Sequence, residues 1–183
     1  MKKIFIIVIL LNTFTVFSQK FELTPHGFVD SEDHSKNYIV IEFASKTKEE
    51  LFNETMIYLT KNYVSAKDVI SKVDNEVITI NAYSSILVTL GFQKYTNRYI
   101  ISFSFKDSKV KIDSPIVDLT YVAGGNLYKL HISSEKSNIL NDRIYGKNNK
   151  LNYKRPKEDL ELFASQFVLS YKLGMFDKKN ENW

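Results

Sequence analysis

The clearest pattern along the chain is a strand-like segment that runs directly into an amphipathic helix. Tyr38–Phe43 alternates and is rich in β-branched and aromatic residues, which predicts a strand. Thr47 and Glu50 then match a capping box, in which the two residues satisfy each other's backbone N–H groups. Apolar residues follow at helical spacing and predict a helix of about four turns with one buried stripe. The stripe consists of Phe52, Met56, Leu59 and Tyr63, with Leu51 beside it.

Beyond this helix a period of two predicts antiparallel strands joined by short turns. Val69–Val73 and Val77–Ala82 flank a polar turn and read as a hairpin. The strongest strand signal is Tyr99–Phe105, whose alternation places Tyr99, Ile101, Phe103 and Phe105 on one face. Residues 83–98 fit either a strand or a short helix. Three further strands are predicted at Val110–Ile112, Ile116–Val122 and Leu127–Ile132.

The two ends of the chain differ in character. Near the N-terminus, Phe21–Leu23 and Phe28-Val29 flank a Pro-His-Gly turn and precede a polar loop at Asp30–Lys36. Near the C-terminus, Pro156 suits the first turn of a second long helix, and Gly174 suits its C-terminal stop. The predicted buried stripe of this helix is Leu160, Phe163, Ala164, Phe167, Val168 and Tyr171.

This order of elements predicts an α+β fold, a two-layer sandwich. A mostly antiparallel sheet carries two long helices packed on one face. The length of 183 residues favours one domain. The predicted division is a signal peptide at 1–18, an N-terminal segment at 19–36, the domain at 37–173 and a C-terminal tail at 174–183.

The first 18 residues have the pattern of a secretory signal peptide. Lys2 and Lys3 precede the unbroken apolar run Ile4–Leu11, and we expect cleavage after Ser18 and before Gln19. An uncleaved membrane anchor is the alternative, but the run is shorter than the roughly 18–20 apolar residues that span a bilayer. The mature chain is therefore expected to be exported, periplasmic or secreted, with no transmembrane segment.

Composition excludes several classes of chemistry. The chain has no cysteine, which excludes disulfides, thiolate catalysis and cysteine-based metal sites. Removal of residues 1–18 leaves 23 Lys+Arg against 21 Asp+Glu, so the net charge falls from +4 to +2. Neither this charge nor an exported location favours a nucleic-acid partner. We expect no cofactor and no metal, and no enzymatic activity, although a hydrolase using two carboxylates in one cleft stays open.

Three clusters could in principle carry chemistry, but each has a simpler explanation. Asp30, Glu32, Asp33 and His34 are close together, yet they lack the spacing and glycine of a calcium loop, and a solvated loop explains them. The histidines, His26, His34 and His131, show no helical zinc-binding spacing. A basic run with interleaved tyrosines, which could hold an anionic surface, is most simply a solvated segment before the last helix. It contains Tyr145, Lys147, Lys150, Tyr153, Lys154, Arg155 and Lys157.

Several of these pieces resemble an exported bacterial family, domain of unknown function 4468, which has a TATA-binding-protein-like fold. They are Phe21–Val29, Ser31–Asp33 before Tyr38–Phe43, Lys46–Leu51 at the helix start, and Lys67–Ile70 followed by Ile78–Asn81. The similarity covers roughly residues 20–130 and implies a fold and an exported location but no activity. The fold name does not imply DNA binding, because function depends on sites and not on folds.

A sheet covered by helices on one face leaves its other face for solvent or a partner. Tyrosines in or near the predicted strands could form an exposed recognition patch there; they are Tyr95, Tyr99, Tyr121 and Tyr128. The leading hypothesis is a non-catalytic domain that binds a protein or envelope component through this face, and it expects serine at Tyr99 and Tyr121 to leave folding nearly intact. Alternatively, these tyrosines line the edge of the core. A second function is a small-molecule or glycan-binding module with a pocket between sheet and helices.

Overall fold

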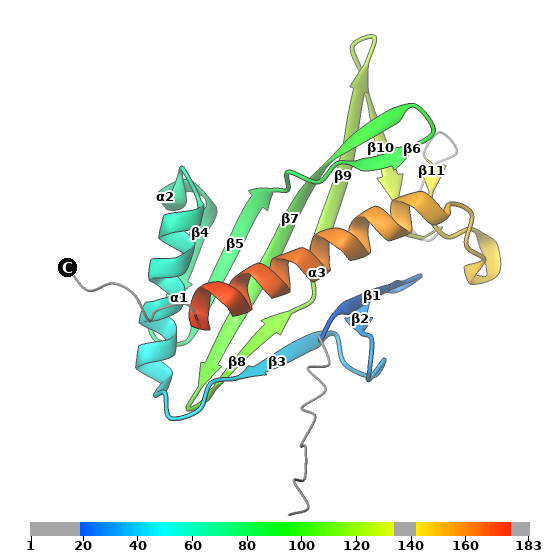
Figure 1. Ribbon diagram of the computed structural model, residues 1–183. Coiled ribbons are helices and arrows are strands. Elements are labelled where there is room, and N and C mark those ends of the chain that lie inside the picture. Colours follow the sequence, from blue (N-terminus) through cyan, green and yellow to red (C-terminus); the bar gives the residue numbers. More distant parts are fainter. Residues whose placement is uncertain (1–18, 134–141, 177–183) are drawn as a thin grey trace, which may run out of the picture.

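The computed structural model describes residues 19–133 and 142–176, and its architecture is the predicted α+β sandwich (Figure 1). The proposed signal peptide and its cleavage site lie outside the described residues, apart from Gln19. A curled, mostly antiparallel sheet forms one layer. The two long helices and a small hairpin form the other layer, all on the same face of the sheet (Figure 1).

The main sheet is organised around β7 (Gln93–Lys106), a strand of 14 residues. One side of β7 pairs with β5 and, near its start, with β6. Its other side pairs with β9 over Thr96–Ile100 and with β8 over Phe103–Lys106. The remaining bounds are β3 (Tyr38–Glu42), β4 (Ile70–Val73), β5 (Val77–Tyr83), β6 (Val88–Leu90), β8 (Lys109–Asp113), β9 (Ile116–Ala123), β10 (Asn126–His131) and β11 (Asp142–Arg143).

The pairing is antiparallel throughout the described sheet except between β10 and β11, which run parallel. β4 pairs with β5, β3 pairs with β8, and β10 pairs with β9. The segment that the sequence left open contains no helix: it supplies the end of β5, the short strand β6 and the first half of β7. The predicted strand at Tyr99–Phe105 is therefore the second half of a longer one.

Helix α1 (Lys48–Asn62) begins as its sequence predicts. The Thr47 hydroxyl accepts a hydrogen bond from the Glu50 N–H, and the Glu50 carboxylate accepts one from the Thr47 N–H at 2.8 Å. Leu51, Phe52 and Leu59 are buried, which confirms most of the predicted stripe. The connector after α1 forms a single helical turn, α2 (Ala66–Val69).

Helix α3 (Lys154–Phe176) crosses the sheet diagonally and also packs against α1 (Figure 1). A 3-10 turn at Lys147–Asn149 precedes it. Its predicted stripe is buried, with Phe167 only partly covered, and it extends one turn further to Met175, which is 1% exposed.

The prediction that Gly174 ends this helix is wrong. Gly174 lies inside α3, where a Cβ atom would stand 2.3 Å from Cε2 of Tyr58 on α1. The glycine is required because the two helices approach closely at this point, and not because the backbone must turn there. A helix-ending glycine and a close-packing glycine are alike in sequence, since both follow an apolar stripe.

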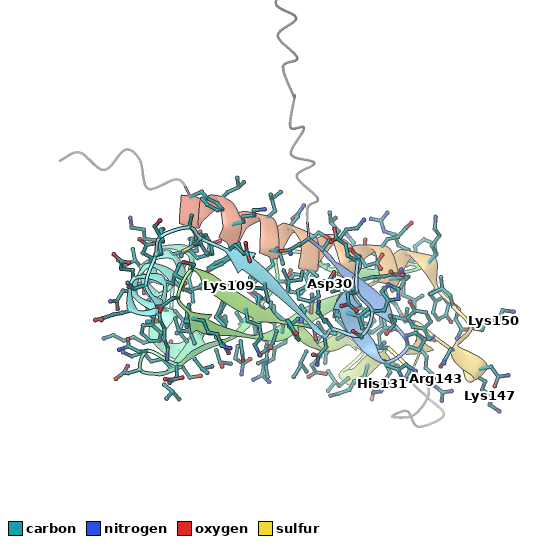
Figure 2. All side chains as sticks on the ribbon, turned by 90° about the horizontal axis from the view of Figure 1, so that it is seen from below. Asp30, Lys109, His131, Arg143, Lys147 and Lys150 are labelled. Atoms are coloured by element: carbon teal, nitrogen blue, oxygen red, sulfur yellow. The ribbon has the colours of Figure 1, made fainter. Side chains whose placement is uncertain are left out.

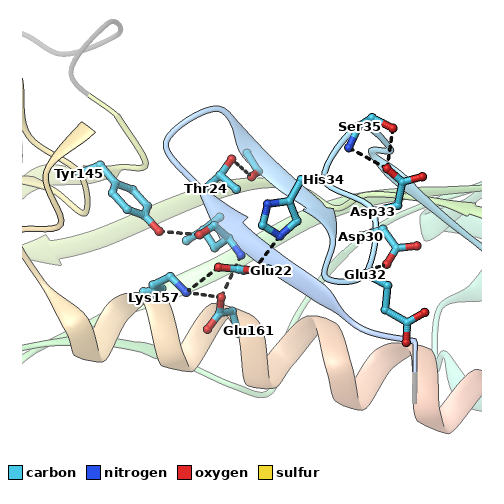
Figure 3. Close-up of polar contacts among 12 residues, drawn as sticks. Glu22, Thr24, Asp30, Glu32, Asp33, His34, Ser35, Tyr145, Lys157 and Glu161 are labelled. Carbon is cyan, nitrogen blue, oxygen red and sulfur yellow. Dashed lines mark hydrogen bonds and ion pairs between the residues drawn. The ribbon is translucent and has the colours of Figure 1, made fainter. Parts of the chain in front are cut away.

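The N-terminal hairpin, β1 (Phe21–Thr24) and β2 (Gly27–Asp30), packs against α3 rather than standing apart. Both backbone polar groups of Leu23 bond to side chains from the C-terminal part of the chain (Figure 3). The Leu23 N–H donates to Oε1 of Glu161 at 2.9 Å, and the Tyr145 hydroxyl donates to the Leu23 carbonyl. Phe21 and Leu23 consequently belong to the main core.

Candidate functional site

The structure divides the four candidate tyrosines between the core and its margin. Along β7, alternate residues from Tyr95 to Phe105 are buried beneath the helices. Tyr95 is 1% exposed and Tyr99 is 4% exposed. The Tyr99 ring lies 4.8 Å from that of Phe163 and 6.0 Å from that of Phe167, both on α3.

Tyr121 and Tyr128 continue this row towards the tip of the sheet. The two residues are paired across β9 and β10, and their rings lie 6.1 Å apart. Tyr121 also contacts Tyr95, with ring centroids 5.7 Å apart. Tyr121 is half-buried and Tyr128 is 37% exposed.

The prediction that these four tyrosines form an exposed patch on the open face is therefore wrong. Tyr95 and Tyr99 point to the helix-covered face, so serine at Tyr99 should damage the core instead of leaving folding intact. Strand alternation identifies which residues share a face, but it does not say which face the helices cover. The alternative prediction, that tyrosines in the strands line the core, is correct for Tyr95 and Tyr99.

The open face carries the other set of alternate residues, those that point away from the helices. Its cations outnumber its acids seven to three, counted from the pairing register of the described strands. Three lysines pair with the three acids at 2.8–3.2 Å. Of the other cations, Lys94, Arg98 and Lys106 have no carboxylate partner among the described residues. The paired lysines are Lys109, Lys111 and Lys129, with Glu42, Asp113 and Asp118 respectively.

Aliphatic side chains lie among these charges. Ile100 and Ile116 are paired across β7 and β9, and Ile116 is 68% exposed. Towards one end of the face, a cavity of about 510 Å³ lies over β3, β7 and β8. There Lys111 Nζ lies 5.6 Å from the centroid of the Tyr38 ring. Seen edge-on, the side chains of the open face project away from α3 (Figure 2).

A second concave site lies on the helix side, between α1, α3 and the β5–β6 edge. This aromatic cavity has a volume of about 410 Å³. On its wall the hydroxyls of Tyr63 and Tyr99 are hydrogen-bonded at 2.6 Å. Its lining is Tyr58, Asn62, Tyr63, Val64, Tyr83, Ser84, Ser85, Ile86, Tyr99, Phe163, Gln166, Phe167 and Ser170, with no charged side chain.

Burial sets the ionisation of the tyrosines that line this cavity. Desolvation raises the pKa of Tyr58 to about 12 and also raises the pKa of Tyr63, which is hydrogen-bonded to Tyr99. Desolvation likewise raises the pKa of Tyr99, while the hydrogen bond from Tyr63 lowers it and so opposes this effect. All three hydroxyls are therefore neutral at ordinary pH and can act as hydrogen-bond donors.

The polar loop at Asp30–Lys36 is held by hydrogen bonds and ion pairs (Figure 3). Asp33 accepts hydrogen bonds from Ser35 and pairs with Lys36 at 2.8 Å, and these contacts, Lys36 first, lower the pKa of Asp33 to about 2. His34 contacts Glu22 instead of its neighbours in sequence. Within the residues that the structure describes, no group of three potential ligands could hold a metal ion.

The basic run is divided among different partners. Lys154, Arg155 and Lys157 form i,i+4 ion pairs along α3. Lys147 and Lys150 project at the far end of the molecule from Lys109 (Figure 2). Tyr145 is buried at the hairpin, so the run does not present interleaved aromatics on one surface.

Solved structures contain the same arrangement of an antiparallel sheet around a long central strand with both helices on one face. A crystal structure of a TBP-like protein from Parabacteroides distasonis matches with a TM-score of 0.52 and 16% identity, over 76% of this chain and 88% of that one. The protein has a TBP-like fold. A DUF4468 family protein from Bacteroides ovatus matches with a TM-score of 0.53 and 12% identity, over 76% of this chain and 84% of that one.

These two TBP-like structures confirm the predicted fold, and their names give no activity. No protein-family model matches the chain, and no curated protein matches it. In the described part of the TBP-like domain, none of the helices combines the length and the apolar character needed to cross a bilayer.

Proposed function

We propose that the protein is an exported, non-catalytic domain that binds an acidic protein surface through the open face of its sheet. The observation that carries this function is the combination of exposed aliphatic side chains with unpaired cations on that face. Ile116 is 68% exposed beside Ile100, while Arg98 and Lys106 have no carboxylate partner among the described residues. The location and the lack of catalysis rest on the sequence.

The aliphatic side chains favour a protein partner over an anionic polymer. Protein interfaces combine an apolar centre with a polar rim. A face designed only for charge would gain nothing from Ile116, which exposes its apolar surface to water in the free protein. The Ile100–Ile116 pair has charged neighbours, because the next pair on the same face of these two strands is Arg98 and Asp118.

The cations define the chemistry expected of the partner. Lys94, Arg98 and Lys106 all belong to the open-face phase of β7. An acidic partner surface would be attracted to this row, and the association rate would fall as salt screens the charges. Residues of the helix side contribute no comparable row, because there the same strand presents Tyr95, Tyr99, Ile101 and Phe103 to the core.

The binding test uses the mature protein, residues 19–183, as bait in an envelope extract of the source organism. Ile116→Glu and the double variant Lys94→Glu/Lys106→Glu should each lose the captured partner, and wild-type capture should weaken with added salt. Lys147→Glu/Lys150→Glu is the matched control, since it reverses two lysines at the far end of the molecule (Figure 2). Circular dichroism establishes that each bait is folded.

Equal capture by all folded baits, or loss only in the control, would overturn the open-face proposal. Export is tested separately by the mass of the protein recovered from the organism. A mature N-terminus at Gln19 supports cleavage after Ser18, whereas an intact Met1 in a cytoplasmic fraction contradicts it.

A further inference from the structure

The aromatic cavity between α1, α3 and the β5–β6 edge has the features of a separate ligand site. Its volume of about 410 Å³ lies within the range of small-molecule pockets, which is about 300–1,000 Å³. It is on the helix side of the sheet, so a ligand there would not compete with a partner on the open face. From this cavity we infer that the protein binds a neutral sugar unit of a glycan.

The lining excludes a strong preference for charged ligands. The side chains that form it are aromatic, aliphatic, amide or hydroxyl groups. A carboxylate or phosphate in this cavity would lose hydration without meeting a cation, which is costly in a partly buried site. A neutral ligand has no such cost.

Hydrogen-bonding capacity is left over at the aromatic wall. The hydroxyls of Tyr63 and Tyr99 are 2.6 Å apart, and either can donate to the other. Such a pair uses only one of its two hydrogens, so the second hydrogen remains for a third group. The Tyr58 hydroxyl and the Gln166 amide also have no hydrogen-bond partner among the described residues.

The rim supplies flat apolar surfaces together with polar groups. The rings of Phe163 and Phe167 form part of its wall. Asn62 uses its amide nitrogen to donate to the Tyr58 carbonyl, which leaves its side-chain oxygen as an acceptor. A pyranose ring has C–H faces that can lie on aromatic rings and hydroxyls around its edge, so it matches both features. A fatty acyl chain would match the rings but would leave the polar groups unpaired.

The experiment is a titration of the mature protein, isotopically labelled, with neutral glucose, galactose, mannose and N-acetylglucosamine disaccharides, followed by amide chemical shifts. Saturable shifts at the amides of Tyr63, Tyr99 and Gln166 are expected with at least one of them. Glucuronic acid and a short-chain fatty acid are the charged and apolar probes, and both should bind more weakly than that disaccharide.

One variant in the cavity and one outside it form a test pair. Gln166→Ala removes an exposed amide that lines the cavity and should weaken sugar binding roughly fivefold to tenfold, as expected for one hydrogen bond. Tyr128→Ala removes a ring outside the cavity and should leave binding unchanged. Tyr99→Phe keeps the ring but removes one hydroxyl of the Tyr63–Tyr99 pair, so it should also weaken binding. The inference is overturned if no neutral disaccharide shifts these amides, if the charged or apolar probe binds more tightly, or if Gln166→Ala binds as wild type does.

Discussion

A buried hydroxyl pair between α1 and α3 offers the sharpest test of how the helices are held together. Thr55 and Tyr171 are both fully buried, and their hydroxyl oxygens lie 2.8 Å apart. Thr55 Oγ1 also lies 4.0 Å from Sδ of Met175, to which it can donate. With Thr55 donating to this sulfur, Tyr171 donates to Thr55. Burial raises the pKa of Tyr171, so its hydroxyl stays protonated.

This geometry predicts unequal costs for the two single substitutions. Thr55→Val leaves the Tyr171 hydroxyl buried without its partner, which should cost about 1–3 kcal/mol of the free energy of unfolding. Tyr171→Phe should cost less, because the Thr55 hydroxyl keeps Met175 as its acceptor and loses only a donor to its oxygen. In the double variant both sites are apolar, so its cost should fall well below the sum of the two.

Urea unfolding of residues 19–183 and of the three variants measures these free energies. A loss of about 2 kcal/mol corresponds to a melting temperature lowered by roughly 4–8 °C in a domain of this size. Thr55→Ser keeps the hydroxyl and is the control, with only the cost of one missing methyl group. Strictly additive effects, or a Tyr171→Phe variant less stable than Thr55→Val, would refute the proposed hydrogen-bond arrangement.

Three further predictions concern packing and pH. Gly174→Ala places a Cβ atom against the Tyr58 ring and should lower stability by about 1–3 kcal/mol, whereas a stable variant in thermal melts would contradict the close helix approach. Glu161→Ala removes the acceptor of the Leu23 N–H, so amide hydrogen exchange at Leu23 should become faster, and unchanged exchange would argue against this contact. Desolvation raises the pKa of Tyr58 to about 12, so its stabilising contribution is complete below the unfolded value near 10 and is lost as pH rises towards 12. Equilibrium unfolding between pH 9 and 12 should show this decline, and constant stability across that range would contradict it.

Local order was predictable wherever neighbours in sequence supply both partners of an interaction. The Thr47–Glu50 capping box is one example, since each residue needs only the other and the backbone between them. The alternation in Tyr99–Phe105 is another, because pleating alone places alternate side chains on one face. The fold class followed from the order of these elements.

The candidate site was less predictable, because it depends on which face of the sheet the helices cover. Tyr95 and Tyr99 were expected on the open face and are buried on the other. The cations that occupy the open face were visible in the same stretch as Lys94 and Arg98, alternating with those tyrosines. If the tyrosines are placed inside, the lysine and arginine that alternate with them must lie on the open face.

Contacts within a few positions of the chain specify the elements and place alternate residues on common faces, so these features can be derived from the sequence. Three other features exist only in the folded chain: Gly174 makes room for Tyr58, Glu161 and Tyr145 hold β1, and α1, α3 and the β5–β6 edge border the aromatic cavity. Each of these joins residues far apart in the chain. Such contacts are decided by how whole faces pack together to bury apolar surface, which no local pattern specifies.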